Sequence, residues 1–312
     1  MTTGVTVSVV GSTEVAKELG KKGTTSDVNL YNAVRDEHAV TLVEPTQFPE
    51  KFPALVTALS MGDRCLLVIP ELNRAIAEAI ATVDVVDVPT TIVLGRAVGE
   101  EELARALKGS RLERADRRPL DLPQLRDLVD GWTAPVVDGP TSVPIDHAFP
   151  VKGVGTVALG VVRRGTLRAH DNLRLWPTDK TVEVRSIQVH DIDRKDAGCG
   201  ERVGVALRGI EADEISRGQV LAPADSLRAG ATIRGGPLVK CRYYRGDIRA
   251  GAQLYLMVGL QSAPASLDEV SAGSTTMTAD RPLAYAPGMP ACVLDLSVPS
   301  GPRIVGRFAI GT

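Results

Sequence analysis

The stretch from Gly11 to Glu18 has the spacing of a phosphate-binding loop but lacks part of its chemistry. Such a loop follows the pattern G-x-x-x-x-G-K-[ST], in which backbone N–H groups surround the phosphates, the lysine neutralises them and the hydroxyl holds Mg²⁺. Gly11 and Lys17 match this pattern. Ala16 replaces the second glycine, where a Cβ makes positive φ costly, and Glu18 puts a carboxylate in place of the hydroxyl.

This loop has two interpretations. It is a strand-to-helix turn whose helix is capped by Ser12 or Thr13, or it retains phosphate binding through Gly11 and Lys17. The two glutamates of the loop repel a triphosphate, each by on the order of 1 kcal/mol or more. The residues therefore favour the plain turn.

The histidines and cysteines predict neither a metal site nor a cofactor. The four histidines are isolated in the sequence, and the four cysteines form no C-x-x-C pair. We expect the cysteines to be small buried side chains in a reducing compartment. No Ser-His-Asp or paired-carboxylate constellation indicates another enzyme.

Charge and hydropathy narrow the class of protein. The 312 residues include 36 Lys and Arg against 38 Asp and Glu, a formal net charge of -2. This balance does not indicate a nucleic-acid binder, although a local basic face is enough for one. The chain shows no signal peptide, and no apolar run reaches the ~18 residues of a membrane span. We expect a soluble, cytoplasmic protein.

The first 134 residues alternate apolar strands with helical stretches. This alternation predicts a parallel sheet with right-handed crossovers, covered on both faces. The expected strands are residues 5–10, 40–43, 64–69 and 90–94. The expected helices are residues 13–22, 49–60, 72–83, 100–107 and 122–129.

After residue 134 the pattern consists of short strand-like runs separated by glycines. Regular short strands with turn signals predict closed β-barrels or sandwiches. A second boundary falls near residue 224, which divides the chain into residues 1–134, 135–224 and 225–312.

From Val143 onward the sequence resembles the second domain of elongation factor Tu and its relatives, most closely the archaeal selenocysteine-specific elongation factor. The matching stretches are residues 145–157, 184–188 and 201–207. The resemblance covers both β regions and, more loosely, the first region. It implies a degenerate P-loop GTPase-like parallel-sheet domain followed by two β-barrels of the elongation factor Tu type. It also implies that the extra C-terminal domain of selenocysteine-specific factors is absent.

The same resemblance allows the nucleotide-binding elements to be compared one by one. The D-x-x-G element of the family, which senses the γ-phosphate, begins here with Glu44 and ends with Gln47 instead of glycine. The histidine that positions the attacking water is Phe48. The guanine-reading [NT]-K-x-D element ends in Val98 instead of aspartate, so its side chain accepts no hydrogen bond from the base. Thr25 matches the switch threonine that binds Mg²⁺.

Only residues 18–24 separate Lys17 from Thr25, so the long effector loop of the family is missing. The remnants of a nucleotide site are Gly11, Lys17 and Thr25. Because several elements fail together, and each touches a different part of the nucleotide, we expect no GTP hydrolysis.

The resemblance further implies an aminoacyl pocket in the second domain. Carried over by motif, its residues are Asp146, His147 and Arg202. In selenocysteine-specific factors such polar side chains surround a selenocysteine whose selenolate is anionic at neutral pH, and a cation and an imidazole suit it. The alternative is a polar cluster at the strand ends that serves the fold.

Several basic runs are candidates for RNA contacts. Arg111, Arg114, Arg117 and Arg118 form one, and arginines flank Tyr243 and Tyr244, whose rings could stack on bases. The alternative is that these runs are solvated surface.

Three hypotheses of function follow. The first is a non-catalytic translation factor that binds tRNA or the ribosome through its β-barrels. The second is a protein–protein module that regulates a true elongation factor. The third is a translation factor with residual GTP binding.

Overall fold

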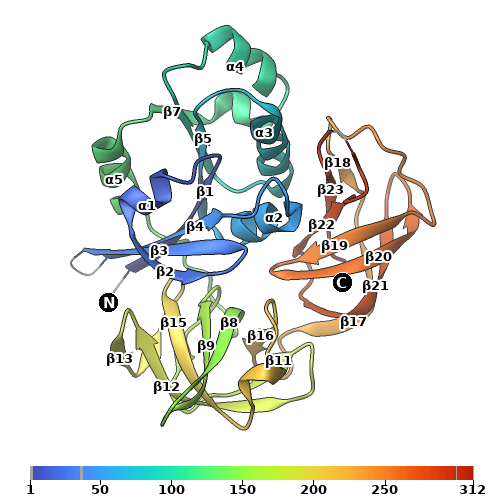
Figure 1. Cartoon of the computed structure of the whole chain (residues 1–312). Helices are drawn as coiled ribbons and strands as arrows, with labels where there is room; N and C mark the ends of the chain where they lie inside the picture. Colours follow the sequence, from blue (N-terminus) through green and yellow to red (C-terminus); the bar gives the residue numbers. More distant parts are fainter. Residues whose placement is uncertain (1–2, 36–37, 300, 312) are drawn as a thin grey trace.

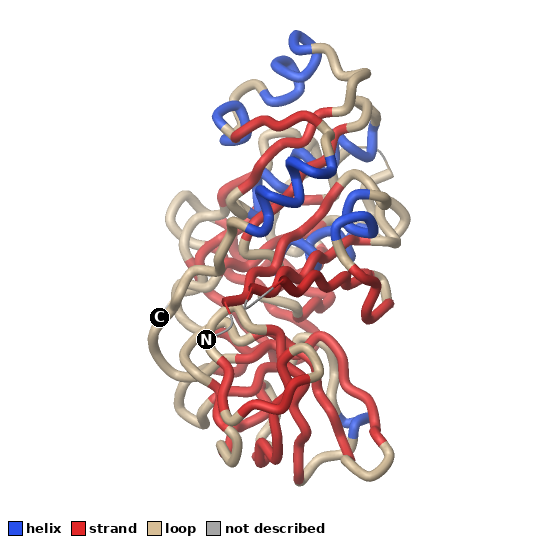
Figure 2. Tube along the Cα trace, turned by 90° about the vertical axis from the view of Figure 1, so that its left-hand side faces the viewer, coloured by secondary structure: helices blue, strands red, loops and turns tan. Residues whose placement is uncertain are grey.

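The computed structural model describes residues 3–35, 38–299 and 301–311, and in that part the chain forms three seven-stranded sheets and one two-stranded sheet (Figure 1). Each large sheet is built from one continuous stretch of sequence, and we call the three parts the first, second and third units. Apart from one short turn of 3-10 helix, the helices surround the first unit (Figure 2). The predicted combination of an α/β region with two β-barrels is confirmed.

The first unit consists of a sheet with helices on both faces. Its strands are β1 (Thr3–Val10), β2 (Lys21–Thr25), β3 (Val28–Arg35), β4 (His38–Pro45), β5 (Arg64–Ile69), β6 (Thr90–Leu94) and β7 (Asp116–Pro119). Its helices are α1 (Val15–Leu19), α2 (Phe52–Met61), α3 (Arg74–Val86), α4 (Glu100–Leu107), the 3-10 helix η1 (Arg111–Arg114) and α5 (Leu122–Asp130). Alternate residues of β5 face opposite sides: Leu67 packs with α2 and α3, and Leu66 with α1 and α5.

The strand order β2-β3-β4-β1-β5-β6-β7 contains a parallel part and an antiparallel edge. Strands β4, β1, β5 and β6 run parallel, as predicted, and β7, which we did not predict, adds a fifth parallel strand. Strands β2 and β3 form a hairpin that pairs antiparallel to β4, which we did not predict. The helix expected at 13–22 ends at Leu19, because Gly20 adopts an extended conformation (φ −144°) and the next residue begins β2.

The second unit is a closed barrel. Its strands are β8 (Val143–Val151), β9 (Gly155–Val161), β10 (Leu167–Arg168), β11 (Asn172–Trp176), β12 (Thr181–Val189), β13 (Ile192–Arg194), β14 (Asp196–Ala197), β15 (Arg202–Arg208) and β16 (Val220–Ala222), with a 3-10 helix η2 (Ala212–Glu214). The order β11-β16-β8-β9-β15-β12-β13 closes through the additional pairing of β11 with β12. Alternating residues, such as Val182, Val184 and Ile187 of β12, fill its interior.

The third unit is a second barrel. Its strands are β17 (Arg228–Gly235), β18 (Val239–Lys240), β19 (Gln253–Val258), β20 (Gln261–Val270), β21 (Thr275–Tyr285), β22 (Pro290–Leu294) and β23 (Ile304–Ala309). The order is β17-β21-β20-β19-β22-β23-β18. A bridge between Gly235 and Ile310 joins β17 to the end of β23 and closes the circle.

The three units contact one another through an apolar core and through ion pairs. One apolar core runs from α2 and α3 into the third barrel, so that Phe52 and Phe308 belong to the same buried cluster. Arginines of the barrels also reach acidic side chains of the first unit. These ion pairs are Arg163–Asp63, Arg217–Asp27, Arg303–Glu78 and Arg307–Asp87.

Two further predictions concern membranes and cysteines. Within the described ranges, no helix has the length and apolarity needed to cross a membrane.

The four cysteines are free thiols. Cys65, Cys241 and Cys292 are buried as expected, whereas Cys199 is only half-buried.

Candidate functional site

The turn after β1 keeps the glycine of a phosphate-binding loop for a steric reason. Gly11 has a φ of +93°, and a Cβ at this position would lie 2.1 Å from the carbonyl oxygen of Val68. The following helix α1 has only five residues. Its N-cap is Glu14, which makes no capping bond with its side chain, so the predicted cap at Ser12 or Thr13 is wrong. The Oγ of Ser12 instead accepts a hydrogen bond from the N–H of Glu14 at 3.3 Å.

The other remnants of the loop do not converge on a phosphate position. The Lys17 side chain is 61% exposed, and its Nζ lies 3.4 Å from a carboxylate oxygen of Glu14. Ala16 beneath it is fully buried in the core. Thr25 lies exposed at the end of β2, and among the described residues its side chain makes no hydrogen bond to Gly11 or Lys17. Gly11 therefore lies in the turn after β1 and Lys17 on the short helix α1 that follows it. Thr25 lies on β2 and, within the described part of the chain, makes no side-chain hydrogen bond to either residue.

The position of the γ-phosphate-sensing aspartate holds a buried carboxyl group. Glu44, at the end of β4, is 2% exposed. Its Oε2 accepts hydrogen bonds from the hydroxyl of Tyr31 at 3.2 Å and from Nδ2 of Asn29 at 3.5 Å, both on β3. Burial raises the pKa of Glu44 above its ordinary value, and the nearby Glu14 raises it further. The two donors lie on β3, a strand of the hairpin that we did not predict. The raised pKa means that burial disfavours the ionised form of this carboxyl group.

This raised pKa gives a testable pH dependence. Because ionisation is disfavoured in the folded state, the contribution of Glu44 to stability is present below its unfolded value, near 4.5, and is lost as pH rises through the folded pKa. The Glu44→Gln variant cannot ionise, so we expect a higher Tm than the parent well above pH 4.5 and no gain well below it. Thermal melts at the two pH values measure this. The exposed Glu50→Gln substitution is the control, and an equal gain at both pH values would contradict the explanation.

Two other positions of the nucleotide elements now serve packing. Phe48, in place of the water-positioning histidine, packs beside Phe52 with ring centroids 6.5 Å apart. Val98, in place of the guanine-binding aspartate, packs against the core that the first and third units share. Neither side chain offers a hydrogen bond to a nucleotide.

In the second unit, Asp146 and Arg202 form a buried ion pair. Two nitrogens of the guanidinium donate to the two carboxylate oxygens at 2.6 and 2.9 Å. The side chains are 2% and 9% exposed. Burial alone would raise the pKa of Asp146, but the Arg202 guanidinium holds it below the ordinary value. The pair is electrically neutral, so Arg202 does not supply the free cation that the resemblance implied for a selenolate.

Two histidines flank this ion pair. The Nδ1 of His147 is buried without a hydrogen-bond partner, 3.7 Å from a carboxylate oxygen of Asp146. His190 was not among the predicted residues, yet burial and the charge of Arg202 lower its pKa. Its place follows from the pairing of the antiparallel strands β12 and β15, in which Gln188 lies opposite Gly204. Because the strands run in opposite directions, residue 190 approaches residue 202. Predicting that His190 lies near Arg202 requires the register of β12 against β15, which the sequence pattern does not show.

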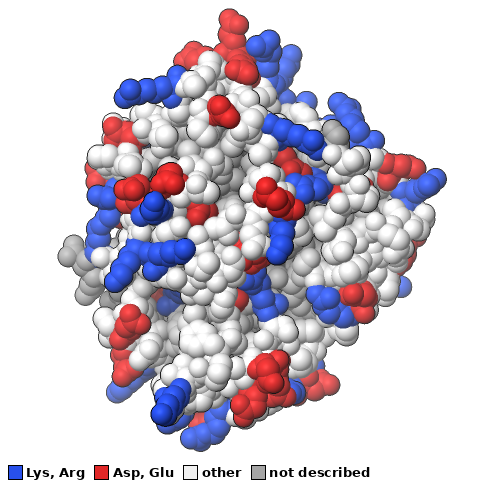
Figure 3. Space-filling view, viewed as in Figure 1, with Lys and Arg blue, Asp and Glu red and all other residues white. Residues whose placement is uncertain are grey.

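The residues of the predicted basic runs differ in exposure: Arg114, Arg117 and Arg118 are exposed, whereas Arg111 is bonded within the first unit. The guanidinium of Arg111 donates to the carbonyl oxygens of Asp84, Val83 and Val88 and lies in the body of the first unit. The hydroxyl of Tyr243 donates to the carbonyl of Ala106, and that of Tyr244 donates to Asp295 at 2.6 Å. Tyr244 is buried, so its ring is not available for stacking on a base, whereas Tyr243 is half-buried. On the face seen in Figure 3, Lys and Arg are interspersed with Asp and Glu and form no continuous basic patch.

Comparison with known proteins places these features in a family. The family description "Elongation factor Tu domain 2" matches residues 155–222. An uncharacterized protein of Methanocaldococcus jannaschii is 35% identical over 298 residues, which cover 94% of this chain and 95% of that protein. The selenocysteine-specific elongation factor of the same organism is 26% identical over 275 residues, and the match covers 80% of this chain but only 59% of that factor.

The fold agrees with solved structures of such factors. The crystal structure of translation elongation factor SelB from Methanococcus maripaludis, in complex with the GTP analogue GppNHp, matches with a TM-score of 0.83 at 20% identity. The match covers 99% of this chain and 79% of that one. The chain therefore belongs to the elongation factor Tu-like family of translation factors, together with the M. jannaschii protein.

Proposed function

We propose that this family member is a non-catalytic translation factor of the cytoplasm, which does not hydrolyse GTP and binds a tRNA or the ribosome through its β-barrels. The proposal rests on the side chains that occupy the positions of the family's nucleotide-binding residues. Phe48 and Val98 pack against the core, and Glu44 is buried among neighbours of its own sheet. These positions have acquired packing partners in place of nucleotide contacts.

The unit interfaces support a factor that acts in one conformation. A translational GTPase couples the γ-phosphate to a change of conformation. Here the first and third units share an apolar core. Arg217 ties the second unit to the β2–β3 turn, with Nη2 donating to Oγ of Ser26 at 2.7 Å and Nη1 bonding Asp27. With no nucleotide to release these contacts, the three units stay together.

The loss of nucleotide binding is tested by titration with a fluorescent GTP analogue and by phosphate release with added Mg²⁺. We expect no saturable signal and no hydrolysis above the buffer rate, because Glu14 and Glu18 repel phosphates and Lys17 is turned to solvent. Measurable hydrolysis that the Lys17→Ala variant abolishes would overturn this part of the proposal. It would favour the hypothesis of residual GTP binding instead.

The RNA partner is tested by crosslinking the protein to RNA in its native cells and sequencing the attached RNA. We expect enrichment of a tRNA, or of ribosomal RNA at the factor-binding centre. His147 lies beside the Asp146–Arg202 pair with its side chain 27% exposed, so the His147→Asn variant is expected to lower the yield. His170→Asn, in an exposed turn of the same barrel, is the matched control. RNA at background level would favour the protein–protein regulatory module.

A further inference from the structure

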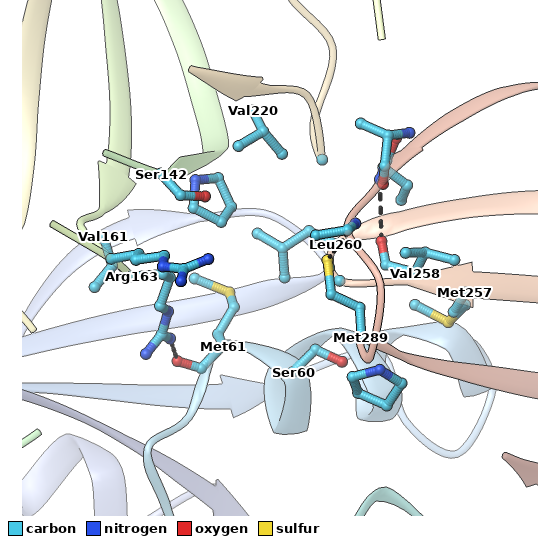
Figure 4. A pocket seen from close by; sticks show the side chains of 18 of the residues that line it. Ser60, Met61, Ser142, Val161, Arg163, Val220, Met257, Val258, Leu260 and Met289 are labelled. Carbon is cyan, nitrogen blue, oxygen red and sulfur yellow. Dashed lines mark hydrogen bonds between the residues drawn. The ribbon is translucent and has the colours of Figure 1, made fainter. Parts of the chain in front are cut away.

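A large cavity lies where the three units meet, and no residue of the proposed nucleotide or aminoacyl sites except Asp146 lines it. Its volume is about 820 Å³. Helix α2 forms its floor through Ser60 and Met61, the second unit contributes Val161 and Arg163, and the third unit contributes Leu260 on the opposite side (Figure 4).

This cavity is too large to be a packing defect. Voids in protein interiors seldom exceed the size of a few water molecules, whereas small-molecule sites measure about 300–1,000 Å³. The contact of α2 and α3 with the third barrel is by contrast filled by a shared apolar core. The cavity is therefore a gap between the three units, of a size that could hold a small molecule.

Two large polar side chains of the wall, Arg163 and Gln261, are already bonded to other protein groups. Arg163 pairs with Asp63 at 2.5 Å and also bonds the carbonyl of Met61. The amide of Gln261 donates to the carbonyls of Val258 and Ala284 and accepts from the N–H of Ala284. These groups leave little hydrogen-bonding capacity for water or for a polar ligand.

The rest of the wall is mostly apolar and adaptable. Met61, Met257 and Met289 line it, with Leu260 and Val220 between them (Figure 4). Methionine side chains are flexible and polarizable, and they adjust to ligands of different shape. Among the charged side chains of the wall, Arg164 differs in having no carboxylate partner in the described part of the chain; its Nε donates to the carbonyl of Asp138.

We propose that this three-unit cavity is a binding site for an uncharged, mainly apolar small molecule. Such a ligand leaves no bonded group of the wall unpaired, because Arg163 and Gln261 are satisfied without it. It gains the free energy of burying apolar surface. Because all three units contact it, the ligand stabilises their closed arrangement. The ligand thereby strengthens the single arrangement of the units and does not switch it. The proposal does not depend on RNA binding.

The test uses Nile red, an uncharged apolar dye, with the purified full-length protein. We expect saturable binding with enhanced, blue-shifted emission. Trp substitutions in two different units, Ser60→Trp in the first and Met289→Trp in the third, reduce the cavity volume and are expected to weaken dye affinity by about tenfold or more. The control is Ser186→Trp, on the exposed face of β12 away from the cavity. Far-UV circular dichroism checks that each variant is folded.

Two results would overturn the proposal. One is equal dye affinity of the parent and both cavity variants, or no saturable binding by the parent. The other is preferential binding of the anionic dye anilinonaphthalene sulfonate that the Arg164→Ala variant abolishes, because the site would then select a charged ligand. A dye-induced rise in Tm of the parent that is absent in Ser60→Trp would show that the ligand also stabilises the closed arrangement.

Discussion

Replacing Asp146 with alanine is expected to lower the free energy of unfolding of the second unit by about 3–5 kcal/mol, because it leaves the Arg202 guanidinium buried without a counter-charge. In the parent the two side chains are 2% and 9% exposed and joined by two hydrogen bonds. Urea denaturation measures the loss. Hydrogen exchange of β8 and β15 locates it, because these strands carry the two residues.

The controls separate a buried charge from a general effect of substitution. Glu183→Ala removes an exposed pair with Arg208 in the same barrel and is expected to change stability by no more than about 1 kcal/mol. The double variant Asp146→Leu with Arg202→Met, which removes both charges, is expected to recover most of the loss. A single variant as stable as the Glu183→Ala control would show that the pair is not buried in solution.

This ion pair also has a predicted pH dependence. Its carboxyl has a folded pKa below the ordinary value of 3.8. The stabilisation is therefore complete above the unfolded value and is lost as pH falls through the folded pKa. The difference in stability between the parent and Asp146→Ala should accordingly shrink in acid.

The second large effect is expected at the interface of the first and third units. Arg303 donates from Nε and Nη2 to the two carboxylate oxygens of Glu78 on α3, at 2.9 and 2.6 Å. Its guanidinium also lies over the ring of Phe52, 4.8 Å from the centroid. In the Arg303→Ala variant the carboxylate of Glu78, whose side chain is 8% exposed, loses its counter-charge and keeps only the hydrogen bond from the backbone N–H of residue 303. We expect a loss of about 3–5 kcal/mol at this interface.

Loss of this contact should loosen the attachment of the third unit. Small-angle scattering is expected to show a larger radius of gyration for Arg303→Ala, and thermal melts a lower Tm. The matched control is Arg249→Ala in the same unit, because Arg249 forms an exposed pair with Asp247, at 79% and 72% exposure. Unchanged scattering and Tm in Arg303→Ala would indicate that the shared apolar core alone holds the two units together.

Local sequence determined much of the secondary structure. Helix α4 and strands β5 and β6 begin and end at the predicted residues, because continuous apolar runs and helical periodicity are local signals. The residue types also determined the chemistry that the nucleotide positions lack: an alanine, a valine or a phenylalanine cannot supply the missing bonds in any fold. The β2–β3 hairpin escaped prediction, because its strands follow a short helix that ends at a single extended glycine.

Only the tertiary structure decided how distant residues meet. His190 lies beside Arg202 through the register of two strands, and Glu78 meets Arg303 across 225 residues. Contacts at such separations depend on how whole units pack, and no local pattern records them. The same packing bonded Arg111 and the two tyrosines to partners inside the protein, and it left the cavity at the junction of the three units.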